Sequence, residues 1–331
     1  MRQLLLIIVM CSSVTCRTNQ ENKSIASPTE TSTLETLADF DTERIAKTWQ
    51  YLTREDRIKI SMINMSVAGV GVLLNSLVII AIIVDPLKIL RQGPWVTILN
   101  LTIVDLVSCI SFFWRWSAEF YKSEQPELFH AIVDAGWIFG ASASFLFLAF
   151  LSVQIFMVTK YPIRRRYFFT TLKIVIICIA LWVTACLLGF SNIVWLLYPR
   201  NTSLKIYAVQ ICFLELAVVV QVVLNIKITA EVIRSRRTAG ISQSKKRRNI
   251  AITVVILTLI FCLTAFPYFV LKQIEFLARL GYIGQDNTAD LLHDVAYCYA
   301  PIAILNFTAN PILYSLRLPQ YRKTFLSFVC N

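Results

Sequence analysis

The chain has 331 residues, of which 56% are hydrophobic and only 16% are charged, and its formal net charge is +12. Soluble domains carry about 25% charged residues, so this composition excludes an ordinary soluble protein as well as disordered and collagen-like chains. We interpret the chain as a membrane protein whose excess of Lys and Arg lies on cytoplasmic connectors, and we expect no nucleic-acid partner.

The first residues are typical of a signal peptide at 1–16. Arg2 supplies a basic start, residues 4–10 are apolar, and 11–16 form a small polar run that suits cleavage. Residues 17–57 are rich in Ser, Thr and Glu and show no sustained apolar period, which predicts a disordered extracellular tail. Asn22 begins a glycosylation sequon in this tail, with an unused tripeptide as the alternative.

Seven apolar stretches follow, each long enough for the roughly 20 residues that a membrane-spanning helix needs. They lie near 60–84, 94–114, 129–159, 171–197, 206–231, 248–272 and 290–316. We therefore predict an all-α fold, a seven-transmembrane helix bundle at 58–317. A short amphipathic eighth helix and a C-terminal tail are expected at 318–331.

Charge predicts the orientation of this bundle. The connectors after the first, third, fifth and seventh spans are rich in Lys and Arg, and Asp85 and Glu231 are their acids. An excess of Lys and Arg marks the cytoplasmic side, so we expect a multi-pass plasma-membrane protein with its N-terminus outside. The basic runs at 164–166 and 245–248 would bind acidic membrane lipids, contact a partner protein or only set the topology.

Several polar side chains lie inside the predicted spans, where an ionisable group is costly unless it has a partner or a function. Asp105 is in the middle of the second span, Asn75 in the first, Ser144 in the third, and Asn306 and Asn310 in the seventh. Such oxygen donors would suit a Na⁺ ion or a water cluster. The alternative is a protonated Asp105 that is hydrogen-bonded to the Asn side chains without any ion. We expect no other cofactor.

The order of these residues along the chain resembles the rhodopsin-like (class A) G-protein-coupled receptors over about 58–331. The residues that carry the resemblance are Asn75, Asn100 to Asp105, Trp182, Phe261 six residues before Pro267, and the run Asn310-Pro311-Ile312-Leu313-Tyr314. The resemblance implies a sodium pocket at Asp105, Ser144, Asn306 and Asn310.

Two prolines fit a conformational switch. Pro267 and Pro311 each free an upstream carbonyl, so the sixth and seventh helices can bend there. A bundle with two packing arrangements would let a ligand outside change a surface inside, although a static kink is the alternative. The predicted switch residues are Asn75, Phe261, Pro267, Asn310, Pro311 and Tyr314.

The chain departs from the family at its inner end. The Asp-Arg-Tyr positions of the family match Gln154-Ile155-Phe156, so the usual Arg is replaced by the apolar Ile155. The toggle Trp position matches Ala265, and His130 replaces the usual disulfide Cys. The resemblance implies a G-protein-facing surface that includes Gln154, Ile155, Phe156, Arg164, Arg165, Lys246 and Arg247.

In this family small ligands lie among the outer halves of the third, fifth, sixth and seventh helices. The candidates here are Asp134, Trp137, Gln210, Glu215, Tyr268, Gln273 and Tyr297. Trp137 stands where amine receptors carry Asp, which argues against a monoamine ligand. The acids of this mouth would attract a basic peptide, or they would only solvate the connector. Asn201 is a second glycan candidate, and Cys330 is a candidate for palmitoylation.

We therefore expect a cell-surface receptor that binds an extracellular ligand, with a peptide as one candidate. It would signal to a heterotrimeric G protein, or to an arrestin, by movement of the sixth and seventh helices. The alternatives are a non-coupling decoy or scaffold receptor and a small-solute transporter, which would need paired helical repeats. We expect no enzyme, because no Gly-x-Ser-x-Gly motif or His-rich metal set occurs in the sequence.

Overall fold

The computed structural model describes residues 52–85, 94–121, 126–161, 169–190, 200–235, 241–283 and 286–329. Across these ranges the chain forms eight helices and no strand. In chain order they are α3 Arg54–Val84, α4 Pro94–Tyr121, α5 Glu127–Lys160, α7 Thr171–Phe190, α8 Arg200–Ser235, α9 Ile241–Arg279, α10 Asp286–Arg317 and α11 Pro319–Val329.

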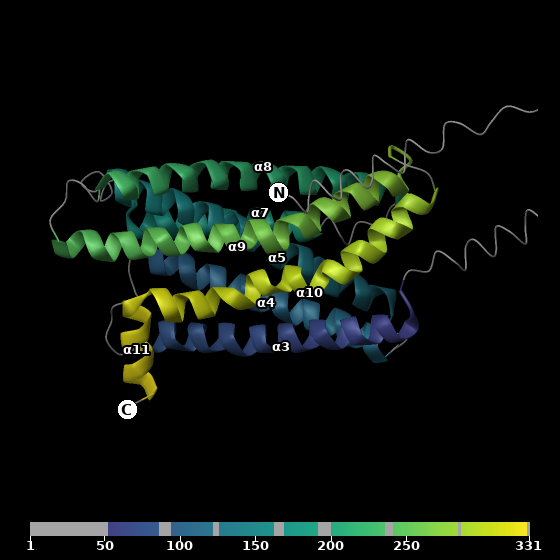
Figure 1. Ribbon diagram of the computed structural model, residues 1–331, viewed down its shortest axis with the longest axis horizontal. Coiled ribbons are helices and arrows are strands. Elements are labelled where there is room, and N and C mark those ends of the chain that lie inside the picture. The colour runs from purple at the N-terminus through teal and green to yellow at the C-terminus, as the bar shows by residue number, and fades with distance from the viewer. Residues whose placement is uncertain are drawn as a thin grey trace, which may run out of the picture.

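Seven long helices run side by side as one bundle, and the short α11 crosses one end of it (Figure 1). Six of the described helices, α3 to α9, are long and apolar enough to cross a membrane. The seventh, α10, is more polar because it carries Asn306, Asn310 and two prolines, but its 32 residues span about 48 Å. The predicted all-α seven-transmembrane bundle with a short eighth helix is confirmed.

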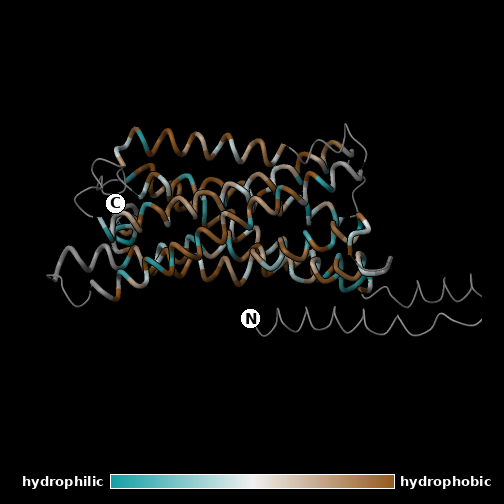
Figure 2. Tube along the Cα trace, turned by 90° about the horizontal axis from the view of Figure 1, so that it is seen from above, coloured by the Kyte–Doolittle hydropathy of each residue, from teal (hydrophilic) through white to brown (hydrophobic). Residues whose placement is uncertain are grey.

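The bundle has two ends, which we name by their elements. At the Arg54 end, α3 and α10 begin and α4 and α9 finish; at the α11 end, α10 passes into α11. Hydrophobic residues run along the length between these ends (Figure 2). Many large apolar side chains face outward, such as Leu73 and Leu263, each 67% exposed. Outward apolar side chains along a helix bundle are what a surrounding lipid bilayer requires.

The core of the bundle is built around α5. In its apolar part 83% of the residues are buried, against 22% in α7 and 33% in α3. The backbones of α4 and α5 approach closely at Gly140, where an added Cβ would lie 2.9 Å from the Ser108 backbone nitrogen. Side chains of α5 therefore reach α4, α8 and α9, and this helix connects the two ends of the molecule.

Helix limits differ in places from the predicted spans. α3 begins at Arg54, inside the predicted tail 17–57, because Thr53 and Asp56 form a reciprocal capping box there. α8 and α9 extend beyond the predicted spans at both ends. α10 contains Pro301 and Pro311 and bends along its length (Figure 1). A proline removes one intrahelical hydrogen bond, which permits such a bend.

Candidate functional site

A cavity of about 490 Å³ opens at the Arg54 end, between α3, α4, α5, α9 and α10. Small-molecule sites in proteins occupy about 300–1,000 Å³. The charged residues of the lining are Arg57, Arg115, Glu119, Asp134 and Lys272, and the aromatic ones are Trp116, Phe129, Tyr268 and Tyr297. His130 and His293 also line it. This cavity has the size and the mixed lining of a ligand site.

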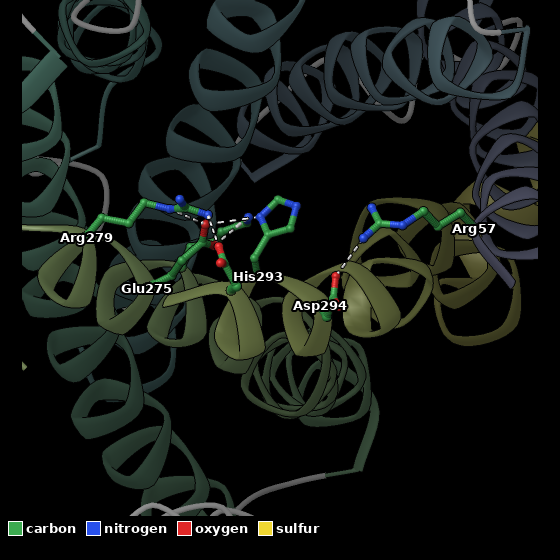
Figure 3. A network of polar contacts seen from close by, with 7 residues as sticks. Arg57, Glu275, Arg279, His293 and Asp294 are labelled. Carbon is green, nitrogen blue, oxygen red and sulfur yellow. Dashed lines mark hydrogen bonds and ion pairs between the residues drawn. The ribbon is translucent and has the colours of Figure 1, made fainter. Parts of the chain in front are cut away.

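Glu275 gathers three basic side chains beside the cavity (Figure 3). Its carboxylate accepts a hydrogen bond from Lys272 Nζ at 2.8 Å and one from Arg279 Nε at 3.0 Å, and it lies 3.1 Å from His293 Nδ1. The Glu275 side chain is only 3% exposed. A carboxylate so deeply buried needs cationic partners, and His293 comes from α10, so the cluster ties α9 to α10.

A second ion pair joins the first and last long helices. Arg57 Nη2 of α3 lies 2.9 Å from Asp294 Oδ1 of α10 (Figure 3), and the Asp294 side chain is 13% exposed. The Arg57 guanidinium also lies 5.1 Å from the centre of the Tyr297 ring, within the range of a cation–π contact. A third pair, Arg115 with Asp134, joins α4 to α5. Arg279 Nη2 of α9 also lies 3.7 Å from Asp290 Oδ1 of α10, so ion pairs reach all five helices around the cavity.

Aromatic rings continue from the cavity into the centre of the bundle. The cavity residue Tyr268 lies 6.3 Å, between ring centres, from Trp137, and the Trp137 ring stacks on Phe269 at 6.2 Å. Phe269 in turn contacts Phe145 at 5.1 Å, and Phe145 contacts Phe261 at 4.4 Å. Ring pairs at these separations are in direct contact, so the path from cavity to core is unbroken.

A polar cluster includes Ser144, which directly precedes the path residue Phe145 in α5. Asp105 is fully buried, and its two oxygens accept hydrogen bonds from Ser144 Oγ at 2.7 Å and from Asn310 Nδ2 at 2.6 Å. The Asn306 side chain is 1% exposed, and its Nδ2 has no hydrogen-bond partner among the described residues. Asn75 Nδ2 donates to the carbonyl of Phe307 at 3.1 Å, which joins α3 to α10. The carboxyl group of Asp105 thus joins α4 to α5 and α10, and Asn75 joins α3 to α10 beside Asn306.

Farther toward the α11 end, a second polar cluster links α5, α8 and α9. Asn225 Nδ2 donates to Ser152 Oγ at 3.1 Å and to Thr258 Oγ1 at 2.9 Å. Gln221 Nε2 also donates to Thr258 Oγ1, at 3.1 Å. We call Ser152, Gln221, Asn225 and Thr258 the amide cluster. All four side chains are at most 5% exposed, so their hydrogen bonds are protected from water and favour the present position of α9.

Comparison with known families decides which kind of bundle this is. The family model of the 7 transmembrane receptor (rhodopsin family) matches residues 74–314. This chain belongs to the rhodopsin family of seven-transmembrane receptors. It is accordingly a multi-pass membrane protein and a receptor rather than an enzyme, as the sequence predicted.

Individual relatives of this receptor are distant. The human lysophosphatidic acid receptor 4 is 26% identical over 55% of this chain and 54% of its own length. The mouse succinate receptor 1 is 25% identical over 56% of this chain and 63% of its own length. The human type-1 angiotensin II receptor is 24% identical over 78% of this chain and 77% of its own length. The match to the first two thus spans little more than half of their length.

The structure brings together only part of the predicted ligand-binding set. Asp134, Tyr268 and Tyr297 line the cavity, and Trp137 lies beneath it in the aromatic path. Gln210, Glu215 and Gln273 do not line it. Gln210 donates to the carbonyl of Leu188 in α7, and Gln273, with its amide nitrogen turned toward α8, donates to Glu215 at 2.7 Å. These three side chains form contacts between helices outside the cavity.

Cations of the cavity were absent from the sequence-based set. Arg57 falls in the predicted tail, Arg115 follows the predicted second span, and Lys272 ends the predicted sixth span. These cations could have been found from the sequence by looking for charged residues at the edges of the apolar helices. Of the two acids in the sequence-based set, Asp134 is paired with Arg115, whereas Glu215 contacts the neutral Gln273. Two further acids near the cavity are also paired with cations, Glu275 with Lys272 and Asp294 with Arg57.

At the α11 end, two of the expected G-protein-facing residues are buried. Ile155 is 1% exposed and Gln154 is 2% exposed, and Gln154 Oε1 accepts a hydrogen bond from Thr97 Oγ1 at 3.0 Å. Phe156 is half-buried, and its ring lies 5.4 Å from Lys160 Nζ. Burial follows from the central place of α5, so a partner reaches Gln154 and Ile155 only if neighbouring helices move.

Other predicted sites lie beyond these findings. The signal peptide at 1–16, most of the tail, Asn22, Arg164, Arg165 and Cys330 are outside the described residues. Asn201 lies in the first turn of α8, and Lys246 and Arg247 lie near the start of α9. Glycosylation, palmitoylation and the signal peptide stay predictions.

Proposed function

We propose that this receptor binds an extracellular ligand in the cavity and activates a heterotrimeric G protein through movement of α9 and α10. The observation that carries the proposal is the continuous aromatic path that begins at Tyr268 and ends at Phe261. The path leads toward the polar cluster, because Phe145 follows Ser144 in α5. A ligand that displaces Tyr268 can therefore change packing beside Asp105.

The cavity would face the outside of the plasma membrane. The Arg54 end follows the predicted extracellular tail, whereas the start of α9 at the α11 end carries the basic run 245–248. Excess Lys and Arg is a feature of cytoplasmic connectors. The same run would bind acidic membrane lipids, at about 1 kcal/mol per basic residue near the surface.

Movement of α9 would open the α11 end. Pro267 and Pro311 lie inside α9 and α10, where each helix can bend. Asn225 and Gln221 hold α9 through Thr258, so outward movement of α9 must break those hydrogen bonds. The movement would expose Ile155 and Gln154 to a G protein or to an arrestin. Ligand binding would act by shifting the population between the closed and open arrangements.

Sodium is proposed as a bound ion of the central cluster. Asp105 carries the acid, and its two hydrogen-bond partners, Ser144 and Asn310, are neutral. Carboxylate, hydroxyl and amide oxygens are the donors that a hard cation takes, and Asn306 adds a further amide. The residues present thus fit Na⁺, which would supply the counter-charge for the buried carboxylate. A proton on Asp105 is the alternative.

Nucleotide exchange tests the proposed function. The receptor, reconstituted in lipid nanodiscs, would be assayed with each class of purified G protein in the presence of lysophosphatidic acid, succinate or angiotensin II, the ligands named by its relatives. We expect raised exchange on at least one G protein. Flat exchange on all classes, with ligand binding intact, would instead indicate a decoy or scaffold receptor. Ligand flux into proteoliposomes would indicate a transporter.

Ile155→Arg supplies a control for coupling, since it restores the side chain that the family carries at this position. With surface level matched by an epitope tag, we expect higher basal exchange than in the parent chain. Ile155→Met, which keeps an apolar side chain of similar volume, should leave basal exchange unchanged.

A further inference from the structure

We propose that the cavity binds an organic anion, a carboxylate or a phosphate ester, and that Arg57 and Lys272 hold its acid group. The inference rests on the proposed function in one respect, because it takes the cavity as the ligand site. It adds the charge of the ligand, which the distant relatives leave open, and it names the side chains that recognise that charge.

Among the described residues, three cations line the cavity, and two of them are paired with acids that do not line it. Arg57, Arg115 and Lys272 line the cavity, whereas Asp294 and Glu275, the partners of Arg57 and Lys272, are not part of its lining. The Asp294 and Glu275 side chains are 13% and 3% exposed. Buried acids fix the positions of the two cations but do not cover the cavity wall. An entering anion thus meets positioned N–H donors.

Arg57 and Lys272 each keep N–H groups that can donate hydrogen bonds to a ligand. A guanidinium has five N–H groups and an ammonium has three. Arg57 donates to Asp294 through Nη2, and Lys272 donates once to Glu275. The side chains of Arg57 and Lys272 are 31% and 14% exposed, so both are partly withdrawn from water. Charge-assisted hydrogen bonds are strong in such surroundings, and the guanidinium fork matches carboxylate and phosphate oxygens.

The remaining lining also selects the ligand. The acids on the wall are Glu119 and Asp134, and Asp134 is already paired with Arg115. A cationic ligand would have to compete with Arg115 for Asp134, would have Glu119 as its other acid, and would approach Arg57 and Lys272. Trp116, Tyr268 and Tyr297 add apolar ring surface to the lining, which suits a carbon skeleton. The same chemistry is found in a free dicarboxylate and in the headgroup of a monoacyl phospholipid, which an experiment can separate.

Binding is tested by thermal unfolding of the purified receptor in nanodiscs, a measurement that needs no G protein. The probes are succinate, 1-oleoyl lysophosphatidic acid, its uncharged relative 1-oleoyl glycerol, and tetra-lysine as a cationic peptide, all at matched ionic strength. A ligand that binds only the folded state raises Tm in a concentration-dependent way. We expect a rise with succinate or with lysophosphatidic acid, and none with 1-oleoyl glycerol or tetra-lysine.

Variants locate the acid group. Arg57→Gln and Lys272→Gln should each weaken binding of the active anion about tenfold to a hundredfold, the loss expected for one charge-assisted hydrogen bond. The double variant Arg57→Gln with Asp294→Asn removes both charges of the pair and guards against misfolding by a stranded Asp294. The matched control is Lys59→Gln, which removes the same charge from an exposed pair with Glu55 outside the cavity.

Each outcome decides between named possibilities. A rise with succinate alone indicates a soluble acid as the source, and a rise with lysophosphatidic acid alone indicates a lipid. The inference is overturned if tetra-lysine raises Tm or if no probe does. It is also overturned if the active anion raises Tm equally in Arg57→Gln and Lys59→Gln. Anion binding without nucleotide exchange would keep this inference and remove the proposed signalling. Nucleotide exchange evoked by a peptide, without anion binding, would keep the proposed signalling and remove this inference.

Discussion

At the scale of single residues, burial decides the role of each charged group. Asp105 is fully enclosed between Ser144 and Asn310, whereas Glu275 is enclosed by Lys272, Arg279 and His293. A buried carboxylate is stable only when its charge is balanced or removed. Glu275 obtains this balance from the protein itself. Asp105 has neutral partners, which is why we assign a cation or a proton to it.

The prediction at this scale concerns sodium. Replacing choline by Na⁺ at constant ionic strength should raise Tm of the ligand-free receptor by a few degrees, since an ion at 100 times its dissociation constant adds about 2.7 kcal/mol. Asp105→Asn, which keeps the shape but removes the charge, should abolish the difference between the two salts. Equal Tm values for the parent chain in both salts would leave Asp105 as a protonated contact between helices.

At the scale of elements, the helices are held by different kinds of contact at the two ends. Ion pairs join α3 to α10 and α4 to α5 at the Arg54 end. Neutral amides and hydroxyls join α5, α8 and α9 in the amide cluster. In place of a charged inner Arg, this receptor has the buried Ile155. We therefore expect the amide cluster, rather than an ion pair at position 155, to hold α9 closed.

Thr258→Val tests the amide cluster, because it removes the hydroxyl that accepts hydrogen bonds from both Asn225 and Gln221. Loss of a buried acceptor costs about 1–3 kcal/mol in the closed arrangement, and we expect basal nucleotide exchange to rise several-fold. Thr264→Val is the matched control, since the hydroxyl of Thr264 donates to the Ile260 carbonyl of its own helix. Equal basal exchange in the two variants would show that the cluster does not restrain α9.

At the scale of the whole molecule, a single bundle connects the cavity at the Arg54 end to the amide cluster toward the α11 end. α5 makes the connection because it is the most buried of the six apolar helices from α3 to α9. Its side chains take part in the cavity, in the aromatic path, in the Asp105 cluster and in the amide cluster. A change in packing at the cavity can therefore reach the α11 end through contiguous contacts.

Topology supplies the prediction for the whole molecule. Epitope tags placed before residue 52 and after residue 331 should be accessible to antibody on opposite sides of intact cells, with the C-terminal tag detected only after permeabilisation. Seven crossings require opposite sides, and the basic connectors predict that the C-terminus lies inside. A tag in the connector 236–240 should behave like the C-terminal tag. Both termini on one side would contradict the proposed direction of signalling.

The sequence alone determined the class of this protein. Length and hydropathy of a helix are local properties, so seven spans, the short eighth helix and the polar positions Asp105, Asn310 and Pro311 could be predicted from the residues in order. Asp134, Tyr268 and Tyr297 were proposed from the family resemblance, which implies a ligand site among the outer halves of these helices, and all three line the cavity.

Only the tertiary structure decided the chemistry of the cavity. Arg57 and Asp294 are 237 residues apart, and their pairing exists because α3 packs beside α10. The same packing turned the acids of the mouth into partners of cations and left Glu215 with Gln273 outside the cavity. An ion pair forms only when its charged atoms come within about 4 Å of each other. Which acids and bases neutralise one another therefore depends on how the helices pack, and no local pattern in the sequence records it.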